Sequence, residues 1–201
     1  MTARSLIALA LLCTGCGSPG ADVSEEDASL PLCAWCGADE APEGLDWDMT
    51  IAGPDEDGER LVITGTVYEA GGTRPASGVL VYAYHADVEG VYPQPGAATG
   101  NGPRHGALRS WLRTNPQGRY RITTVRPAPP ADEAGPARIH MTVQPPTERE
   151  YPIDEIVFAG DSLLTPAVRA GFDRRGGTGI VRLRRDAQGV WRGRRDILLE
   201  R

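Results

Sequence analysis

Short apolar runs rich in β-branched residues recur along the chain from Arg60 onward, and turn-forming residues separate them. Runs of this length, bounded by Gly, Pro, Asn or Asp, are typical of β-strands. The 25 Gly and 17 Pro among 201 residues also favour many short strands and disfavour a helical bundle. The runs lie at residues 60–69, 79–86, 107–114, 119–125, 138–144, 155–158, 179–185 and 190–199. We therefore expect an all-β fold, an antiparallel β-sandwich.

The charges are distributed unevenly along the chain. All 21 Lys and Arg positions are arginine, against 27 acids, which gives a net charge of −6. Residues 17–60 hold thirteen acids and one arginine, whereas residues 166–201 hold ten arginines and four acids. The net acidity argues against a nucleic-acid partner. The acidic stretch is either a solvated tether or a partner for the arginine-rich end.

The N-terminus carries an export signal. Arg4 precedes the apolar stretch 5–12, and small residues follow it up to Cys16. The apolar stretch is much shorter than the roughly 20 residues that cross a bilayer. The sequence before Cys16 resembles a bacterial lipobox, although Cys13 stands where leucine is commonest. This resemblance implies a signal peptide at 1–15, lipidation of Cys16 and attachment to the cell envelope, at the outer membrane because no aspartate follows Cys16. Simple secretion is the alternative.

The region after the signal is expected to be a spacer. Residues 16–45 are rich in Asp, Glu, Ala, Gly, Pro and Ser with little apolar periodicity, so packing should begin near Leu45 or Trp47, in a domain over 46–201. In an exported chain, Cys33 and Cys36 most simply form a disulfide. A redox-active pair and half of a zinc site are the other readings of this Cys-x-x-Cys motif.

Six segments carry a family resemblance, because they follow one another in a characteristic order and spacing. They are residues 65–68, 74–79, 84–92, 114–127, 137–141 and 158–161. Over roughly residues 58–165 the chain resembles the intradiol ring-cleavage dioxygenases. The resemblance implies a β-sandwich and a non-haem ferric iron held by two tyrosinates and two histidines. Such an iron activates a catechol-type aromatic for attack by dioxygen between its two hydroxyl-bearing carbons.

Transferred position by position, the family's iron ligands are only partly present. Tyr92 matches the first tyrosinate, and His140 matches the second histidine of the His-x-His pair. The first histidine falls on Arg138, whose guanidinium stays protonated and cannot bind a metal. The second tyrosinate falls at Pro130, and an arginine of the family falls on Gly135. Losing a phenolate and gaining a cation both oppose Fe(III) binding.

Replacement ligands are the remaining route to an iron site. The candidates on the nearby strand and the loop after it are Tyr82, Tyr84, His85 and His105. Tyr82 and Tyr84 share one face of a strand, a pattern that more often marks aromatic packing. Asp154 and Glu155 should point to opposite faces of their strand and so form no carboxylate pair.

Three functions follow from these expectations. By resemblance the chain is a Fe(III) dioxygenase for catechol-type aromatics, with its activity in question because two ligands are missing. Alternatively it is a non-catalytic module whose cleft, lined by Arg126 and Arg138, accepts an anionic or aromatic ligand. The third is a structural protein of the envelope. Two observations distinguish these functions: whether Tyr92 and His140 lie close together, and whether any replacement ligand lies beside them.

Overall fold

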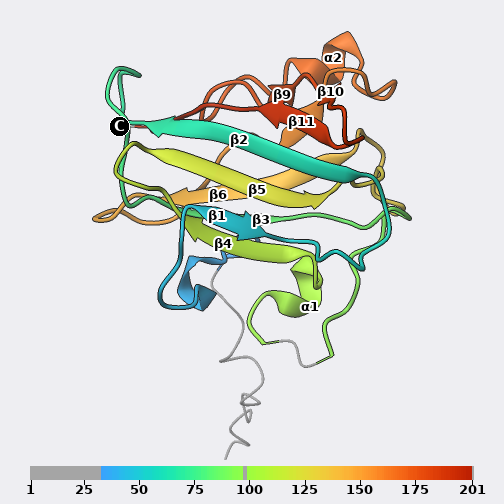
Figure 1. Ribbon diagram of the computed structural model, residues 1–201, viewed down its shortest axis with the longest axis horizontal. Coiled ribbons are helices and arrows are strands. Elements are labelled where there is room, and N and C mark those ends of the chain that lie inside the picture. Colours follow the sequence, from blue (N-terminus) through green and yellow to red (C-terminus); the bar gives the residue numbers. More distant parts are fainter. Residues whose placement is uncertain (1–32, 97–98, 201) are drawn as a thin grey trace, which may run out of the picture.

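Two six-stranded sheets pack face to face in the computed structural model, which describes residues 33–96 and 99–200 (Figure 1). One sheet has the order β1-β5-β2-β11-β10, with β12 also paired to β2, and the other has the order β4-β3-β6-β8-β9, with β7 paired to β6. The predicted β-sandwich is confirmed. The elements are η2 (Ala38–Glu40), β1 (Asp48–Thr50), β2 (Arg60–Tyr68), β3 (Leu80–Tyr84), α1 (Gly102–His105), β4 (Arg109–Arg113), β5 (Arg119–Val125), β6 (Arg138–Gln144), β7 (Tyr151–Pro152), β8 (Ile156–Phe158), α2 (Pro166–Arg169), β9 (Ile180–Val181), β10 (Arg184–Arg185), β11 (Trp191–Arg194) and β12 (Ile197–Leu198).

Antiparallel pairing joins the long strands, as expected from the sequence. In the first sheet β2 pairs with β5 from Arg60 opposite Val125 to Thr66 opposite Arg119. In the second sheet β3 lies between β4 and β6 and pairs antiparallel with both. The short strands β1, β9, β11 and β12 are instead added in parallel to a neighbour. The long strands therefore pair antiparallel with one another, whereas the short strands are mixed, because β7, β8 and β10 are added antiparallel.

The alternation of side chains along β6 separates the core from the functional face. Ile139, Met141 and Val143 are buried in the core between the sheets. Successive residues of a strand point to opposite faces, so Arg138 and His140 lie on the outer face of the second sheet. Each large aliphatic side chain that is buried this way stabilises the fold by roughly 1.5–3 kcal/mol. The core therefore fixes the direction in which His140 points.

The segment with the two cysteines packs on the domain, although the sequence led us to expect a flexible spacer up to residue 45. Cys33 and Cys36 form a disulfide with 5.5 Å between their Cα atoms. The Asn101 side chain donates hydrogen bonds to the carbonyls of both cysteines, and the Trp111 indole donates one to the carbonyl of Gly37. Ordered packing thus begins by Cys33 and not near Leu45. Composition does not predict it, because the partners of this segment lie more than 60 residues further along the chain.

The expected signal peptide, the lipidation of Cys16 and the lack of a transmembrane helix concern the N-terminus and the membrane. The signal peptide and Cys16 lie outside the described residues. Among residues 33–96 and 99–200, no helix has the length and apolar character needed to cross a membrane.

Candidate functional site

A tight turn after β3 presents Tyr92 to the outer face of the second sheet. The Asp87 carboxylate accepts a hydrogen bond from the Val91 N–H at 2.9 Å, and the Val91 carbonyl accepts one from the Asp87 N–H at 2.8 Å. Gly90 has φ +79°, and a Cβ at this position would collide with the Pro129 carbonyl. A glycine is therefore required there. The turn also bonds to the chain at Ala131, so it is held from both sides.

Tyr92 and His140 meet, as their match to the family's ligands implies. The Tyr92 Oη lies 2.7 Å from Nε2 of His140. Tyr92 is half-buried, and burial raises the pKa of its hydroxyl to about 12. The phenol is therefore protonated at neutral pH and donates its hydrogen to the imidazole.

Glu155 completes a chain of three hydrogen-bonded groups. Its Oε1 lies 2.5 Å from Nδ1 of His140, so Nδ1 carries the proton and Nε2 is left as the acceptor for Tyr92. Burial opposes ionisation of Glu155, but the His140 hydrogen bond and the nearby Arg138 charge outweigh it and lower the carboxyl pKa. The result is a fixed tautomer of His140 between an ionised carboxylate and a phenol.

The role of Glu155 follows from the pairing of β6 with β8 and is not apparent in the sequence. Ile139 pairs with Ile156 across β6 and β8, and continuing this antiparallel register by one residue places Glu155 opposite His140. The register could not be read from the sequence, because the connection between the two strands carries no fixed turn pattern.

Arg138 occupies the position of the missing histidine and is held by carboxylates. Its Nη1 lies 3.4 Å from Glu133 and 3.7 Å from Glu155, and its side chain is only 14% exposed. The guanidinium therefore shares Glu155 with His140. The position of the second tyrosinate holds Pro130, which is buried and offers no side-chain ligand.

His105 and the two tyrosines of β3 lie on the same face, where His105 and Tyr82 are hydrogen-bonded to each other and the Tyr84 ring stacks on both imidazoles. His105 donates from Nε2 to the Ala34 carbonyl and accepts at Nδ1 from the Tyr82 hydroxyl, each at 2.7 Å. The Tyr84 ring stacks on His105 at 3.8 Å and on His140 at 4.4 Å between centroids. Burial lowers the His105 pKa to about 4. This imidazole is neutral and both of its nitrogens are in use.

His85 faces the other sheet. It donates from Nδ1 to the Ala86 carbonyl at 2.7 Å, and Nε2 accepts from the Thr124 hydroxyl of β5 at 2.6 Å. Burial lowers its pKa to about 4. Neither of the candidate histidines therefore replaces the missing ligand.

The side chains present do not fit a ferric site with two tyrosinates and two histidines. A 2.7 Å separation suits two adjacent ligands that each lie about 2 Å from one metal, so Tyr92 and His140 match half of such a site. The other half is an ion-paired guanidinium and a proline. Within the part of the chain that the structure describes, no three His, Cys, Asp or Glu side chains come together to hold a metal ion.

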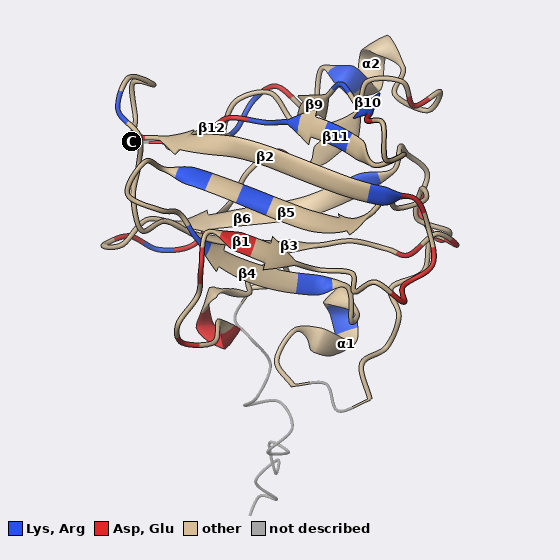
Figure 2. Ribbon diagram, in the orientation of Figure 1, with Lys and Arg blue, Asp and Glu red and all other residues tan. Residues whose placement is uncertain are grey.

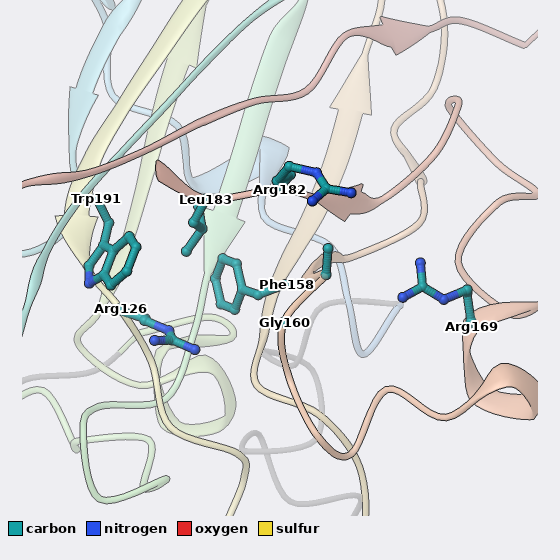
Figure 3. Close-up of a pocket in the computed structure, with 8 residues that line it drawn as sticks. Arg126, Phe158, Gly160, Arg169, Arg182, Leu183 and Trp191 are labelled. Carbon is teal, nitrogen blue, oxygen red and sulfur yellow. The ribbon is translucent and has the colours of Figure 1, made fainter. Parts of the chain in front are cut away.

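Arg126 and Arg138, expected to line one cleft, lie at separate places. Arg126 lines a cavity together with Phe158 and Trp191, and Arg138 is not among the residues around it (Figure 3). Arg138 instead lies beside His140 through their shared partner Glu155.

Solved structures with the same fold are dioxygenases. The dioxygenase domain of a carbohydrate-binding fusion protein from Streptomyces sp. SirexAA-E matches with a TM-score of 0.57 and 20% identity, over 79% of this chain and 95% of that one. Catechol 1,2-dioxygenase from Acinetobacter sp. ADP1 matches with a TM-score of 0.58 and 22% identity, over 77% of this chain and 57% of that one. Hydroxyquinol 1,2-dioxygenase from Pseudomonas putida DLL-E4 matches with a TM-score of 0.57 and 20% identity, over 79% and 63%.

These identities establish a shared fold, and the chain spans about three fifths of the catechol and hydroxyquinol enzymes. No curated protein sequence matches. The family model described as Dioxygenase matches residues 39–174, well over half of the chain. Together with the order of the six sequence segments and the meeting of Tyr92 with His140, this match establishes that the chain belongs to the intradiol dioxygenase family.

Proposed function

We propose that this chain is a lipid-anchored envelope protein whose intradiol dioxygenase-like domain binds a small ligand without cleaving it. The observation that carries the proposal is Arg138, a cation at the position of an iron-binding histidine. It pairs with Glu155, the carboxylate that orients His140. A 3+ ion at this place would meet an added positive charge and would lack one phenolate.

The other residues of the site hold His140 in a fixed position through hydrogen bonds and ring stacking. Glu155 holds the Nδ1 proton of His140, and the Tyr92 hydroxyl donates to Nε2. Tyr84 stacks on the His140 ring and limits its rotation. Each polar atom of the His140 ring thus has a partner without a metal.

Iron content and the visible spectrum test this proposal. The full chain, purified in detergent and offered a ferric salt, should bind no stoichiometric iron and show no tyrosinate-to-iron absorption. The Arg138→His variant removes the cation and supplies an imidazole, so it should bind ferric iron about tenfold more tightly or better. Arg138→Gln removes the charge without adding a ligand and is the control. Stoichiometric iron with a coloured band in the unaltered chain would overturn the proposal.

The second candidate function is ring cleavage of a catechol-type aromatic by a ferric site. The observation that favours it is the 2.7 Å approach of Tyr92 Oη to His140 Nε2, since these two positions match family ligands. Oxygen uptake with catechol by the iron-loaded chain distinguishes the two functions. Uptake that disappears in Tyr92→Phe would establish the second function over the first.

The anchoring part of the proposal rests on the sequence around Cys16. Membrane fractionation of cells that express the full chain tests it. The unaltered chain should sediment with outer membranes, and Cys16→Ser should not acquire lipid. Equal sedimentation and an unchanged mass for both chains would contradict lipidation.

A further inference from the structure

A cavity of about 400 Å³ lies at the end of the molecule that carries α2, β9 and β11. Its charged lining is Arg126, Arg169 and Arg182, and its apolar lining includes Phe158, Leu183 and Trp191 (Figure 3). This volume is in the usual range for small-molecule sites, which hold roughly 300–1,000 Å³. Neither Tyr92 nor His140 lines it. The cavity is therefore separate from the site that the family resemblance indicates.

The three arginines come from three different elements and converge on one space. Arg126 follows β5, Arg169 ends α2, and Arg182 follows β9. In Figure 3 their guanidinium groups lie around the segment with Phe158 and Gly160. Like charges that the fold brings together repel each other, and a bound anion removes this repulsion.

Carboxylates of the protein compensate these charges only in part. No Asp or Glu lines the cavity. Within residues 33–96 and 99–200, the ion pairs of the structure include neither Arg169 nor Arg182, and Arg126 is 3.9 Å from Glu59. Glu59 also pairs with Arg185 at 3.3 Å. Two of the three guanidiniums are thus free to bind an external anion. Figure 2 shows further arginine positions along β10 and β11, at the same end of the molecule.

Aromatic rings hold Arg126 in place before any ligand arrives. Its guanidinium carbon lies 5.6 Å from the centroid of Phe158 and 5.8 Å from that of Trp191. Such cation–π contacts contribute roughly 0.5–1 kcal/mol each at exposed sites, and they restrict the guanidinium to one region. The Phe158 ring is buried, while Leu183 and Trp191 are half-buried. The cavity therefore combines cations with a rigid apolar wall.

We propose that this cavity binds a small aromatic carboxylate. The carboxylate groups would be held by Arg169 and Arg182, whose planar forks match a carboxylate in bidentate geometry. The ring of the ligand would lie against the half-buried side chains of Leu183 and Trp191. An inorganic anion would satisfy the arginines but leave the accessible parts of Leu183 and Trp191 in contact with water, so it should bind more weakly. The inference rests on the proposed ligand-binding function and specifies its site and ligand class.

Calorimetric titration of the full chain in detergent tests the inference, with phthalate, benzoate, benzamide and inorganic phosphate as probes. Phthalate should bind most tightly, benzoate next, and neutral benzamide and phosphate at least about tenfold more weakly than phthalate. The affinity for phthalate should fall as salt is raised, because Arg169 and Arg182 are exposed. Equal affinity for phosphate and phthalate would overturn the part of the inference that concerns the ring.

Matched variants locate the binding. Arg182→Gln and Arg169→Gln should each weaken phthalate binding by about tenfold. Arg184→Gln is the control, because Arg184 is also exposed, lies two residues from Arg182 and does not line the cavity. Identical urea unfolding curves would show that the variants are folded. Loss of binding in Arg184→Gln equal to that in Arg182→Gln would overturn the location.

The outcome is separable from that of the iron test. Absence of phthalate and benzoate binding in a chain that also takes up no iron would reject this inference and leave the loss of ferric chemistry intact. Phthalate binding in a chain that takes up stoichiometric iron would support the cavity and reject the non-ferric assignment.

Discussion

At the scale of single residues, burial rather than metal binding explains the properties of His85. Burial lowers its pKa to about 4, from about 6.5 in an unfolded chain. Between these two pKa values, His85 is protonated in the unfolded chain and neutral in the folded chain. The stability that the neutral ring provides is therefore complete above pH 6.5 and is lost as the pH falls toward 4. This loss amounts to roughly 3 kcal/mol.

His85→Gln should remove this pH dependence. Glutamine keeps a donor for the Ala86 carbonyl and an acceptor for the Thr124 hydroxyl, but it does not titrate. Urea unfolding at pH 7 and pH 4.5 should show a smaller loss of stability on acidification in the variant than in the unaltered chain. Effects of the carboxylates and of His105 are common to both chains and cancel in the comparison. Equal losses would contradict a neutral buried His85.

At the scale of elements, the sequence runs predicted the long strands and the region of the short strands β8 to β12, whereas β1 and β7 lie outside every predicted run. The runs at 119–125 and 138–144 coincide with β5 and β6, because alternating apolar residues define both faces of a strand. Strands β1 and β7 have three and two residues, too few for a period, and they form because a neighbouring strand pairs with them. The role of Glu155 could not be predicted either, because it depends on the register between β6 and β8. Of the site, the sequence predicted Tyr92 and His140.

The Glu150 carboxylate is one of several groups that attach the segment around η2 to the second sheet. Glu150 accepts hydrogen bonds from the N–H groups of Gly37, at 3.0 and 3.1 Å, and Ala38, at 2.9 Å. It also accepts a bond from the Thr142 hydroxyl. Hydrogen bonds to an ionised group are among the stronger ones, so Glu150→Ala should lower the free energy of unfolding by about 2 kcal/mol.

Limited proteolysis and urea unfolding check this prediction. Cleavage within residues 33–45 should become faster in Glu150→Ala, because the segment loses its attachment to the second sheet. Glu148→Ala changes an exposed residue of the same loop. It should leave the cleavage rate unchanged and the free energy of unfolding within about 0.5 kcal/mol of the unaltered chain. An unchanged cleavage rate in Glu150→Ala would show that the other attachments, which include Asn101 and the Glu40–Arg109 ion pair, hold the segment without it.

At the scale of the whole molecule, Arg195 joins the two sheets in an unusual way. Its backbone lies so close to β2 that Gly65 has no room for a Cβ. Its carbonyl accepts a hydrogen bond from the Tyr120 hydroxyl at 2.7 Å. Its side chain is 2% exposed and reaches across the core to within 3.3 Å of the Met141 sulfur. Nε and Nη2 have no partner among the described residues. Burial lowers its pKa, which reflects the cost of a charge in the core.

Replacing this guanidinium by an apolar side chain should stabilise the molecule. Arg195→Met keeps the backbone bonds, gives up the hydrogen bond to the Met141 sulfur and removes the buried charge, so the free energy of unfolding should rise by about 2 kcal/mol. Arg194→Met, at the exposed neighbouring position, is the control and should change stability by no more than about 0.5 kcal/mol. Urea unfolding of the three chains measures both effects. Destabilisation by Arg195→Met would mean that the guanidinium has a partner in solution, such as buried water, and that the charge contributes to holding the sheets together.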